Sequence, residues 1–159
     1  MFSKNTFPFL SMFIILSIFT LPAAAQLADK KVVALDGAKA IAAAGEVEAN
    51  KLKLNVVIAV VDDGGHLIYL QRADGAPTGS IDVAIGKART AAAFKRPTKV
   101  LDDMATTRPA IATLPNTVLL EGGVPIMVGE QVVGAVGVSG ASSQQDAQIA
   151  EAGISALKK

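Results

Sequence analysis

The sequence contains no cysteine and no tryptophan, and it has a single histidine. Without cysteine, the chain forms no disulfide, carries no thiolate nucleophile and offers no sulfur ligand to zinc or to an iron–sulfur cluster. One histidine also excludes a metal site built from several histidines of one chain. Stability therefore has to come from packing, from self-association, or from both.

An excess of charge of one sign is also missing. The 159 residues hold 15 Lys+Arg and 14 Asp+Glu, and Lys4 lies in a segment that we predict to be removed, which leaves 14 of each sign. A balanced chain has no electrostatic footprint for nucleic acid or for an anionic membrane. Beyond residue 25 the only aromatic residues are Tyr69 and Phe94, too few for a surface that stacks bases.

The first 25 residues have the features of an export signal. Lys4 precedes the apolar run Phe9–Phe19, and the small residues Ala23–Ala25 offer a cleavage site after it. We predict a signal peptide at 1–25 and a single domain at 26–159, located in the periplasm or outside the cell. An uncleaved N-terminal anchor is the alternative that this pattern leaves open.

The rest of the chain alternates helical and extended apolar patterns. We predict helices at about 36–52, 80–96, 98–107 and 143–157, and strands at 56–61, 66–72, 118–120, 124–128 and 131–138. Short turns at Asp62–Gly65 and Gly129–Glu130 make neighbouring strands antiparallel. The order predicts an α+β domain with one antiparallel sheet of about five strands flanked by helices.

Three helix starts are expected from capping residues. Asp36 and Ser80 precede the first two helices and are side chains that cap helix N-termini. Ser143 and Asp146 have the S-x-x-D spacing that marks the start of the last helix.

The second helix carries the densest set of candidate binding residues. Its apolar stripe runs through Ile81, Ala84, Ile85, Ala88 and Ala91, and we expect this stripe to face the core. The polar candidates lie off the stripe, and the helix exit adds one more cation: Asp82, Lys87, Arg89, Thr90 and Arg96. Their cations can bind a carboxylate or a propionate. A solvated charged face explains the same residues without a ligand.

Two further places could contact a ligand. Ser139 and Gly140 end a glycine-rich strand just before a helix, where exposed amides can accept an anion, although ordinary turn chemistry explains them equally well. His66 follows two glycines at the head of a strand and can serve as an axial metal ligand or a general base. A surface histidine beside a turn is the alternative.

Five segments, in order, resemble motifs of the GlcG/HbpS family of haem-binding-like proteins. They are the first hairpin Leu54–His66, the central helix Ser80–Phe94 with its exit Arg96–Thr98, then Gly122–Ile126, Gly134–Gly140 and Gln145–Asp146. The resemblance covers roughly residues 35–157.

This resemblance implies a profilin-like α-β-α fold and assembly into dimers, larger rings or octamers. It also implies haem as a possible cofactor, because some exported members bind haem and act in haem sensing or breakdown. Relatives include the C-terminal domain of PduO-type proteins and proteins encoded beside glycolate or diol metabolism. The family pattern matches at Ser80, Lys87, Ala88 and Thr90. Beyond the signal peptide, the candidate iron ligands are His66, Tyr69, Met104 and Met127.

Three functions therefore remain open. The first is an exported protein that binds a small ligand, with haem as the named candidate. The second is a cofactor-independent enzyme acting on a small organic acid, with Asp82 or His66 as base and Lys87 holding the carboxylate. The third is a non-catalytic oligomeric module.

For the ligand site we predict that Asp82, Lys87 and Thr90 border one pocket with Ser139 and Gly140, and that Lys87 is solvated.

Overall fold

The computed structural model describes residues 29–157, so the predicted signal peptide and its cleavage site lie outside the described residues. The elements in chain order are α1 (Leu35–Lys51), β1 (Val57–Asp62), β2 (Leu67–Arg72), α2 (Ser80–Phe94), α3 (Thr98–Thr107), the 3-10 helix η1 (Pro109–Thr113), β3 (Gly123–Val128), β4 (Gln131–Ser139) and α4 (Ser143–Ser155). The α+β prediction is confirmed. The described part of the chain forms one antiparallel sheet with helices on both faces.

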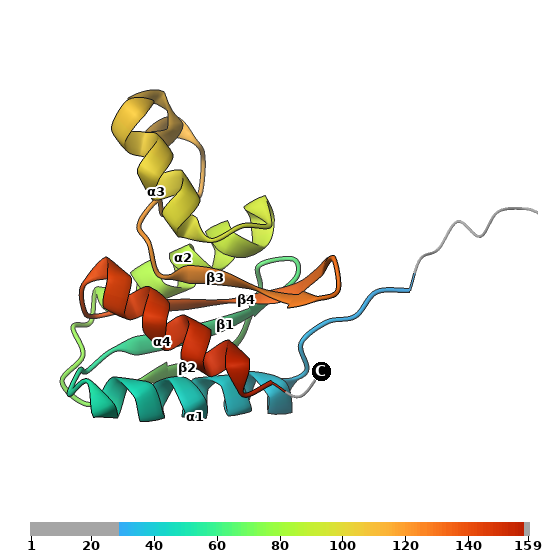
Figure 1. Ribbon diagram of the computed structural model, residues 1–159, viewed down its shortest axis with the longest axis vertical. Coiled ribbons are helices and arrows are strands. Elements are labelled where there is room, and N and C mark those ends of the chain that lie inside the picture. Colours follow the sequence, from blue (N-terminus) through green and yellow to red (C-terminus); the bar gives the residue numbers. More distant parts are fainter. Residues whose placement is uncertain (1–28, 158–159) are drawn as a thin grey trace, which may run out of the picture.

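The sheet has the strand order β2-β1-β4-β3, and α1 and α4 cover one face while α2 covers the other (Figure 1). The central strand β1 is apolar on both faces, as expected for a strand between two helical layers. Ile58 and Val60 pack with α1 and α4, whereas Val57, Ala59 and Val61 pack against the alanines of α2. This alternation builds two separate apolar layers.

The strand expected at 118–120 is absent, and the sheet of the described residues has four strands. Side chains, and no neighbouring strand, hold this segment. The Val118 amide donates to the Thr90 hydroxyl oxygen (2.9 Å), and the Glu121 amide donates to the Asp102 carboxylate (2.9 Å). Leu120 stays about half exposed. The apolar run therefore becomes a tethered loop beside the sheet.

The predicted caps are displaced by one residue or more. The N-cap of α1 is Ala34, and Gly79 holds that position in α2, with no side-chain cap bond in either helix. At α4 the cap is Ser142, whose side chain forms a reciprocal capping box with Gln145. This box leaves Asp146 free for another contact.

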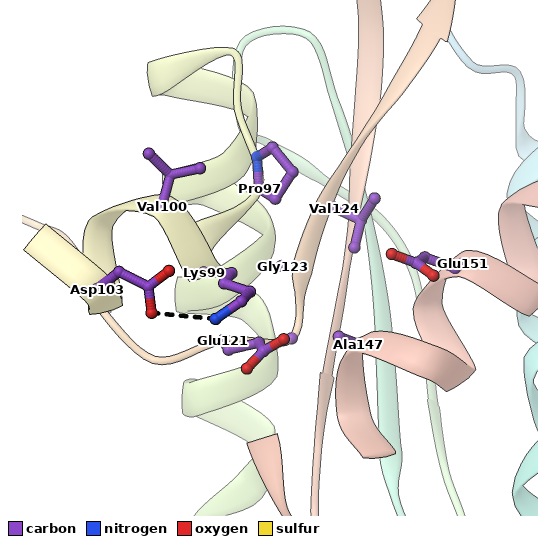
Figure 2. Close-up of a pocket in the computed structure, with 10 residues that line it drawn as sticks. Pro97, Lys99, Val100, Asp103, Glu121, Gly123, Val124, Ala147 and Glu151 are labelled. Carbon is purple, nitrogen blue, oxygen red and sulfur yellow. Dashed lines mark hydrogen bonds and ion pairs between the residues drawn. The ribbon is translucent and has the colours of Figure 1, made fainter. Parts of the chain in front are cut away.

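The helix α3 and η1 project beyond the sheet (Figure 1), and only Thr98 and Leu101 of α3 are buried. Between α3, the start of β3 and α4 lies a hollow of about 280 Å³, which we call the α3–α4 pocket (Figure 2). Among residues 29–157 no helix has the length and apolar character needed to cross a membrane.

The second helix lies close to β4 because Gly137 has no side chain. A Cβ atom there would stand 2.6 Å from the backbone nitrogen of Ala88 and closer still to the carbonyl oxygen of Ala84. Backbone atoms cannot rotate aside as a flexible side chain can. The glycine therefore sets the distance between α2 and the sheet.

We predict that Gly137→Ala lowers the free energy of unfolding by about 1–3 kcal/mol, the usual cost of overpacking. Gly79→Ala is the matched control, because no atom lies within 4 Å of its Cβ position and its φ is −63°. Urea unfolding of both variants measures the difference. An equal, small loss in both would contradict the role assigned to Gly137.

Candidate functional site

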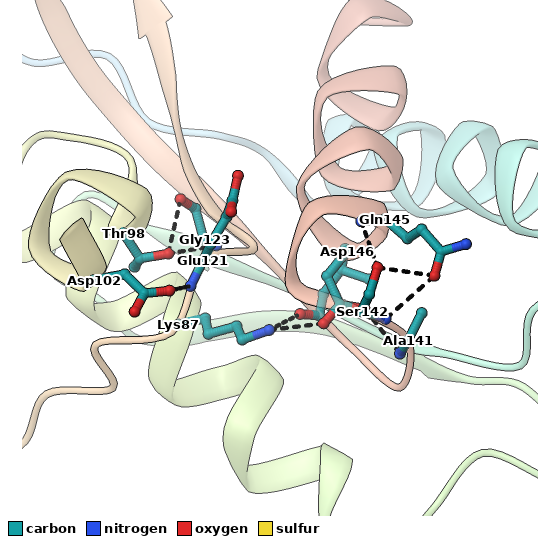
Figure 3. Close-up of polar contacts among 10 residues, drawn as sticks. Lys87, Thr98, Asp102, Glu121, Gly123, Ala141, Ser142, Gln145 and Asp146 are labelled. Atoms are coloured by element: carbon teal, nitrogen blue, oxygen red, sulfur yellow. Dashed lines mark hydrogen bonds and ion pairs between the residues drawn. The ribbon is translucent and has the colours of Figure 1, made fainter. Parts of the chain in front are cut away.

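A buried ion pair connects the two helical layers. The Lys87 ammonium of α2 lies 2.8 Å from Oδ2 of Asp146 in α4, and it also donates to the Val138 carbonyl oxygen at 3.0 Å (Figure 3). Lys87 is only 2% exposed, so the prediction of a solvated lysine was wrong. Its side chain runs past the end of the sheet and does not point into solvent.

Each oxygen of the Asp146 carboxylate has a partner in this arrangement. Oδ1 accepts the Ala141 amide at 3.1 Å, while Oδ2 accepts Lys87. Burial raises the pKa of the Asp146 carboxyl, and the hydrogen bond and charge of Lys87 oppose that shift. A buried charge with one partner removed is costly, so each group depends on the other.

Glycine at position 122 gives the ion pair its space. A Cβ atom on Gly122 would lie 2.8 Å from the Lys87 nitrogen and 2.9 Å from the Val138 oxygen, and its φ of +125° suits glycine. The next residue, Gly123, both donates to and accepts from the Thr98 hydroxyl. The start of β3 is thus fixed on one side by Lys87 and on the other by Thr98 of α3.

The sequence predicts Asp146 to belong to the helix cap, whereas the structure buries it beyond the cap. The capping box at Ser142 and Gln145 shows that another pair could start the helix equally well. With Ile149, Ala150 and Gly153, Asp146 then falls on the buried side of α4 at helical spacing. An acidic residue on an apolar stripe is the signal that could have indicated a buried cationic partner.

A second feature is an open hollow beside the first hairpin, of about 400 Å³, which we call the hairpin pocket. Turn, helix and loop residues line it together: Gly64, His66, Arg89, Phe94, Pro115 and Asn116. Thr90 also reaches its wall. The structure therefore brings three of the predicted site residues, His66, Arg89 and Thr90, into one place.

The His66 imidazole is exposed but oriented. Its Nδ1 lies 3.3 Å from Oδ2 of Asp62, and its backbone amide donates to Oδ1 of the same carboxylate at 2.8 Å. Desolvation raises the pKa of Asp62, but hydrogen bonds from His66 and Gly64 outweigh it and leave that pKa below its usual value. An ionised Asp62 favours Nδ1 as the donor, which leaves Nε2 as the basic nitrogen.

Arg89 and Thr90 differ in what they can still bind. Arg89 uses Nε to donate to the Gly65 carbonyl oxygen at 3.2 Å, and within residues 29–157 no hydrogen bond or ion pair is formed by its terminal nitrogens. The Thr90 hydroxyl donates to the Gly86 carbonyl and accepts the Val118 amide. Thr90 therefore shapes the pocket wall. Its hydroxyl proton is already donated to Gly86, so the hydroxyl cannot also donate to a ligand.

The other predicted site residues lie elsewhere. Ser139 pairs with Val57 and Gly134 with Asp62, so Ser139 and Gly140 stand at the end of β1 opposite to the hairpin turn. Asp82 is exposed in the first turn of α2. Arg96 is exposed and donates to the Phe94 carbonyl oxygen. The structure does not gather these residues with Lys87 in one pocket.

Metal-binding groups are sparse in the part of the chain that the structure describes. No cluster of three or more His, Asp or Glu side chains could hold a metal ion there. Of the candidate iron ligands, His66 lines the hairpin pocket, whereas Tyr69, Met104 and Met127 do not. The second hypothesis, an enzyme that holds a carboxylate with Lys87, also loses support because this ammonium already binds Asp146.

We predict that Lys87→Met lowers the free energy of unfolding by about 3–5 kcal/mol, because it leaves the Asp146 carboxylate buried without its cation. Lys87→Met combined with Asp146→Asn should cost less than the sum of the two single changes, since the amide still accepts the Ala141 amide. Chemical denaturation of the wild type, both single variants and the double variant measures this coupling.

Lys39→Met on the exposed face of α1 is the matched control, and we expect a change within about 0.5 kcal/mol. If Lys87→Met were as mild as Lys39→Met, the ion pair would contribute nothing to the fold.

Comparison with known proteins places this architecture in a family. A family model described as "Haem degrading protein HbpS-like" matches residues 33–155. Protein GlcG of Escherichia coli (strain K12) is 46% identical over 111 residues, which cover 69% of this chain and 83% of that protein.

Solved structures agree with this match. A double mutant of HbpS from Streptomyces reticuli superposes with a TM-score of 0.80 at 33% identity, over 87% of this chain and 96% of that chain. A structure described as a PduOC:Heme complex has a TM-score of 0.73 at 26% identity, over 80% of this chain and 96% of the other. On its sequence and its fold together, the chain belongs to the GlcG/HbpS family.

Proposed function

We propose that this domain binds haem in the hairpin pocket, with Nε2 of His66 as the iron ligand. The family description names haem degradation, and one related structure is a haem complex, which supports haem as the ligand class. The observation that carries the proposal is the contact between His66 Nδ1 and Asp62. Histidines that bind metals commonly donate their second nitrogen to a carboxylate in this way.

The remaining walls suit an amphipathic ring. Phe94, Ala93 and Pro115 offer apolar surface, and Arg89 adds a cation to the same lining. A guanidinium binds a propionate through charge-assisted hydrogen bonds. The volume of about 400 Å³ falls within the range of small-molecule sites.

The haem iron, when bound, supplies the redox and ligand chemistry of the group. The chain contributes binding and orientation. Asp62 holds the imidazole in one tautomer, and the Thr90 hydroxyl fixes the loop at Val118 that borders the pocket. Gly64 leaves room for the ring, because a Cβ atom there would lie 3.0 Å from His66 Nδ1.

We predict that hemin added to the wild-type domain gives a Soret band that saturates. His66→Ala should weaken binding about ten-fold or more and shift the band, because the iron loses its nitrogen ligand. Absorbance titration at constant hemin measures both effects. An unchanged spectrum and affinity in His66→Ala would exclude His66 as the ligand, and no saturable band in the wild type would refute the proposal.

Arg89 is the residue expected to contact the propionate, and Arg96 at the exit of α2 provides the matched control. Arg89→Met should lower the affinity several-fold, whereas Arg96→Met should leave it unchanged, because Arg96 lies outside the pocket. Asp62→Asn should give an intermediate loss, since Asp62 positions the imidazole and does not touch the iron.

Export is part of the same proposal and is supported only by the sequence. The apolar run before Ala23–Ala25 has the length and flanks of a signal peptide. Self-association also stays a prediction. Several large apolar side chains of the described residues are exposed and are available for it: Val32, Leu35, Val47, Leu67, Val100 and Leu120.

We predict that the exported protein begins at Gln26, with a mass lower by residues 1–25. Ala25→Arg should block cleavage, because a signal peptidase needs a small residue at this position, while Ala24→Arg should be tolerated between the two small-residue positions. Intact-mass measurement of all three proteins checks this. Retention of Met1 in the exported wild type would contradict it.

A further inference from the structure

The α3–α4 pocket is separate from the hairpin pocket and has its own chemistry. Its volume is about 280 Å³, and α3, the start of β3 and α4 enclose it. Figure 2 shows Lys99 and Asp103 on one side, Ala147 and Glu151 on the other, and Glu121 between them.

Glu121 is the unusual group in this pocket. The residue is only 9% exposed, and no hydrogen bond or ion pair is formed by its carboxylate with any of the described residues. In that same part of the chain, every side-chain oxygen or nitrogen that is fully buried has a hydrogen-bond partner. Because the carboxylate oxygens of Glu121 have none, neither oxygen is fully buried. Both are therefore accessible from the pocket that Glu121 lines.

The two lysines near Glu121 already form ion pairs with other carboxylates. Lys99 lies 3.0 Å from Asp103, and this hydrogen bond, with smaller contributions from the charges of Asp103 and Glu121, holds the pKa of Lys99 above its usual value. Lys87 lies behind Gly122 and binds Asp146. With Glu151 at the rim, the lining holds one cation and three carboxylates.

The rest of the lining is mostly apolar. Val100, Val124 and Ala147 surround the carboxylate, so a ligand that fits must combine a positive head with a short hydrocarbon part. A bare metal ion is disfavoured, because these residues offer no group of three ligating side chains within reach. A buried carboxylate in apolar surroundings gains most from a cation that also excludes water.

We propose that the α3–α4 pocket binds a small organic cation, an ammonium or guanidinium group on a short apolar chain, with Glu121 as its counter-ion. The backbone of Gly122 and Gly123 also lines the pocket. This site does not depend on haem binding, because it shares no lining residue with the hairpin pocket.

Titration with n-butylammonium chloride, followed by NMR of the Gly122 and Gly123 amides, tests the site. We expect saturable shifts in the wild type and an affinity about ten-fold or more lower in Glu121→Gln, which loses the charge and keeps the shape. Glu130→Gln in the exposed β3–β4 turn should bind like the wild type. Neutral n-butanol and anionic butyrate should give no saturable shift.

Equal binding of butylammonium to the wild type and Glu121→Gln would overturn the proposal, as would saturable binding of butanol. Displacement of butylammonium by magnesium or calcium ions at matched ionic strength would assign the site to an inorganic cation instead. A lower molecular mass of Glu121→Gln by light scattering would show that the cation is a side chain of a second copy.

A folding defect must be separable from a binding defect. If Glu121→Gln does not fold, Glu151→Gln at the exposed rim replaces it, and we expect a smaller but measurable loss of butylammonium affinity. No loss in this folded variant would also count against the proposal. Hemin titration of either folded variant should match the wild type, so failure of this site and failure of haem binding are distinguishable.

Discussion

The fold depends on one interaction that joins the helical layers on the two faces of the sheet. Lys87 comes from the helix on one face of the sheet, and Asp146 comes from a helix on the other. Their ion pair fits beside the start of β3 because Gly122 has no side chain. Moving β3 by one residue would put either Glu121, whose side chain would occupy this space, or Gly123 in the place of Gly122. The buried pair therefore fixes the contact between the helices and disfavours a shift of β3 that removes glycine from this position.

The loop before β3 is the second consequence. Thr90 of α2 holds it at Val118, and Asp102 of α3 holds it at Glu121. Its early residues border the hairpin pocket, and its last residues line the α3–α4 pocket. One irregular segment thus contributes to both pockets. Hydrogen bonds to side chains hold this segment in place, instead of the backbone hydrogen bonds of a fifth strand.

The sequence predicts those features that follow from local patterns. The apolar run at 56–61, the Gly129–Glu130 turn and the alanine stripe of α2 lead to strands and helices close to their observed bounds. The burial of Lys87 does not follow, because its partner lies 59 residues away and no local period links them. The segment 118–120 has the apolar pattern of a strand, but its tethers, Thr90 and Asp102, come from helices distant in the sequence. Long-range polar contacts are what single-sequence periodicity cannot show.

The two pockets differ in charge although the chain as a whole is nearly neutral. Arg89 and the His66 imidazole face the hairpin pocket, whereas three carboxylates and one lysine line the α3–α4 pocket. A chain with balanced charge has no long-range field to steer ligands, and salt screens charges beyond about 8–10 Å. Selectivity must then arise from groups in direct contact with each ligand. For the two ligands that we propose, an acid would meet an organic cation and an arginine would meet a propionate, so each pocket would select its ligand independently of the other.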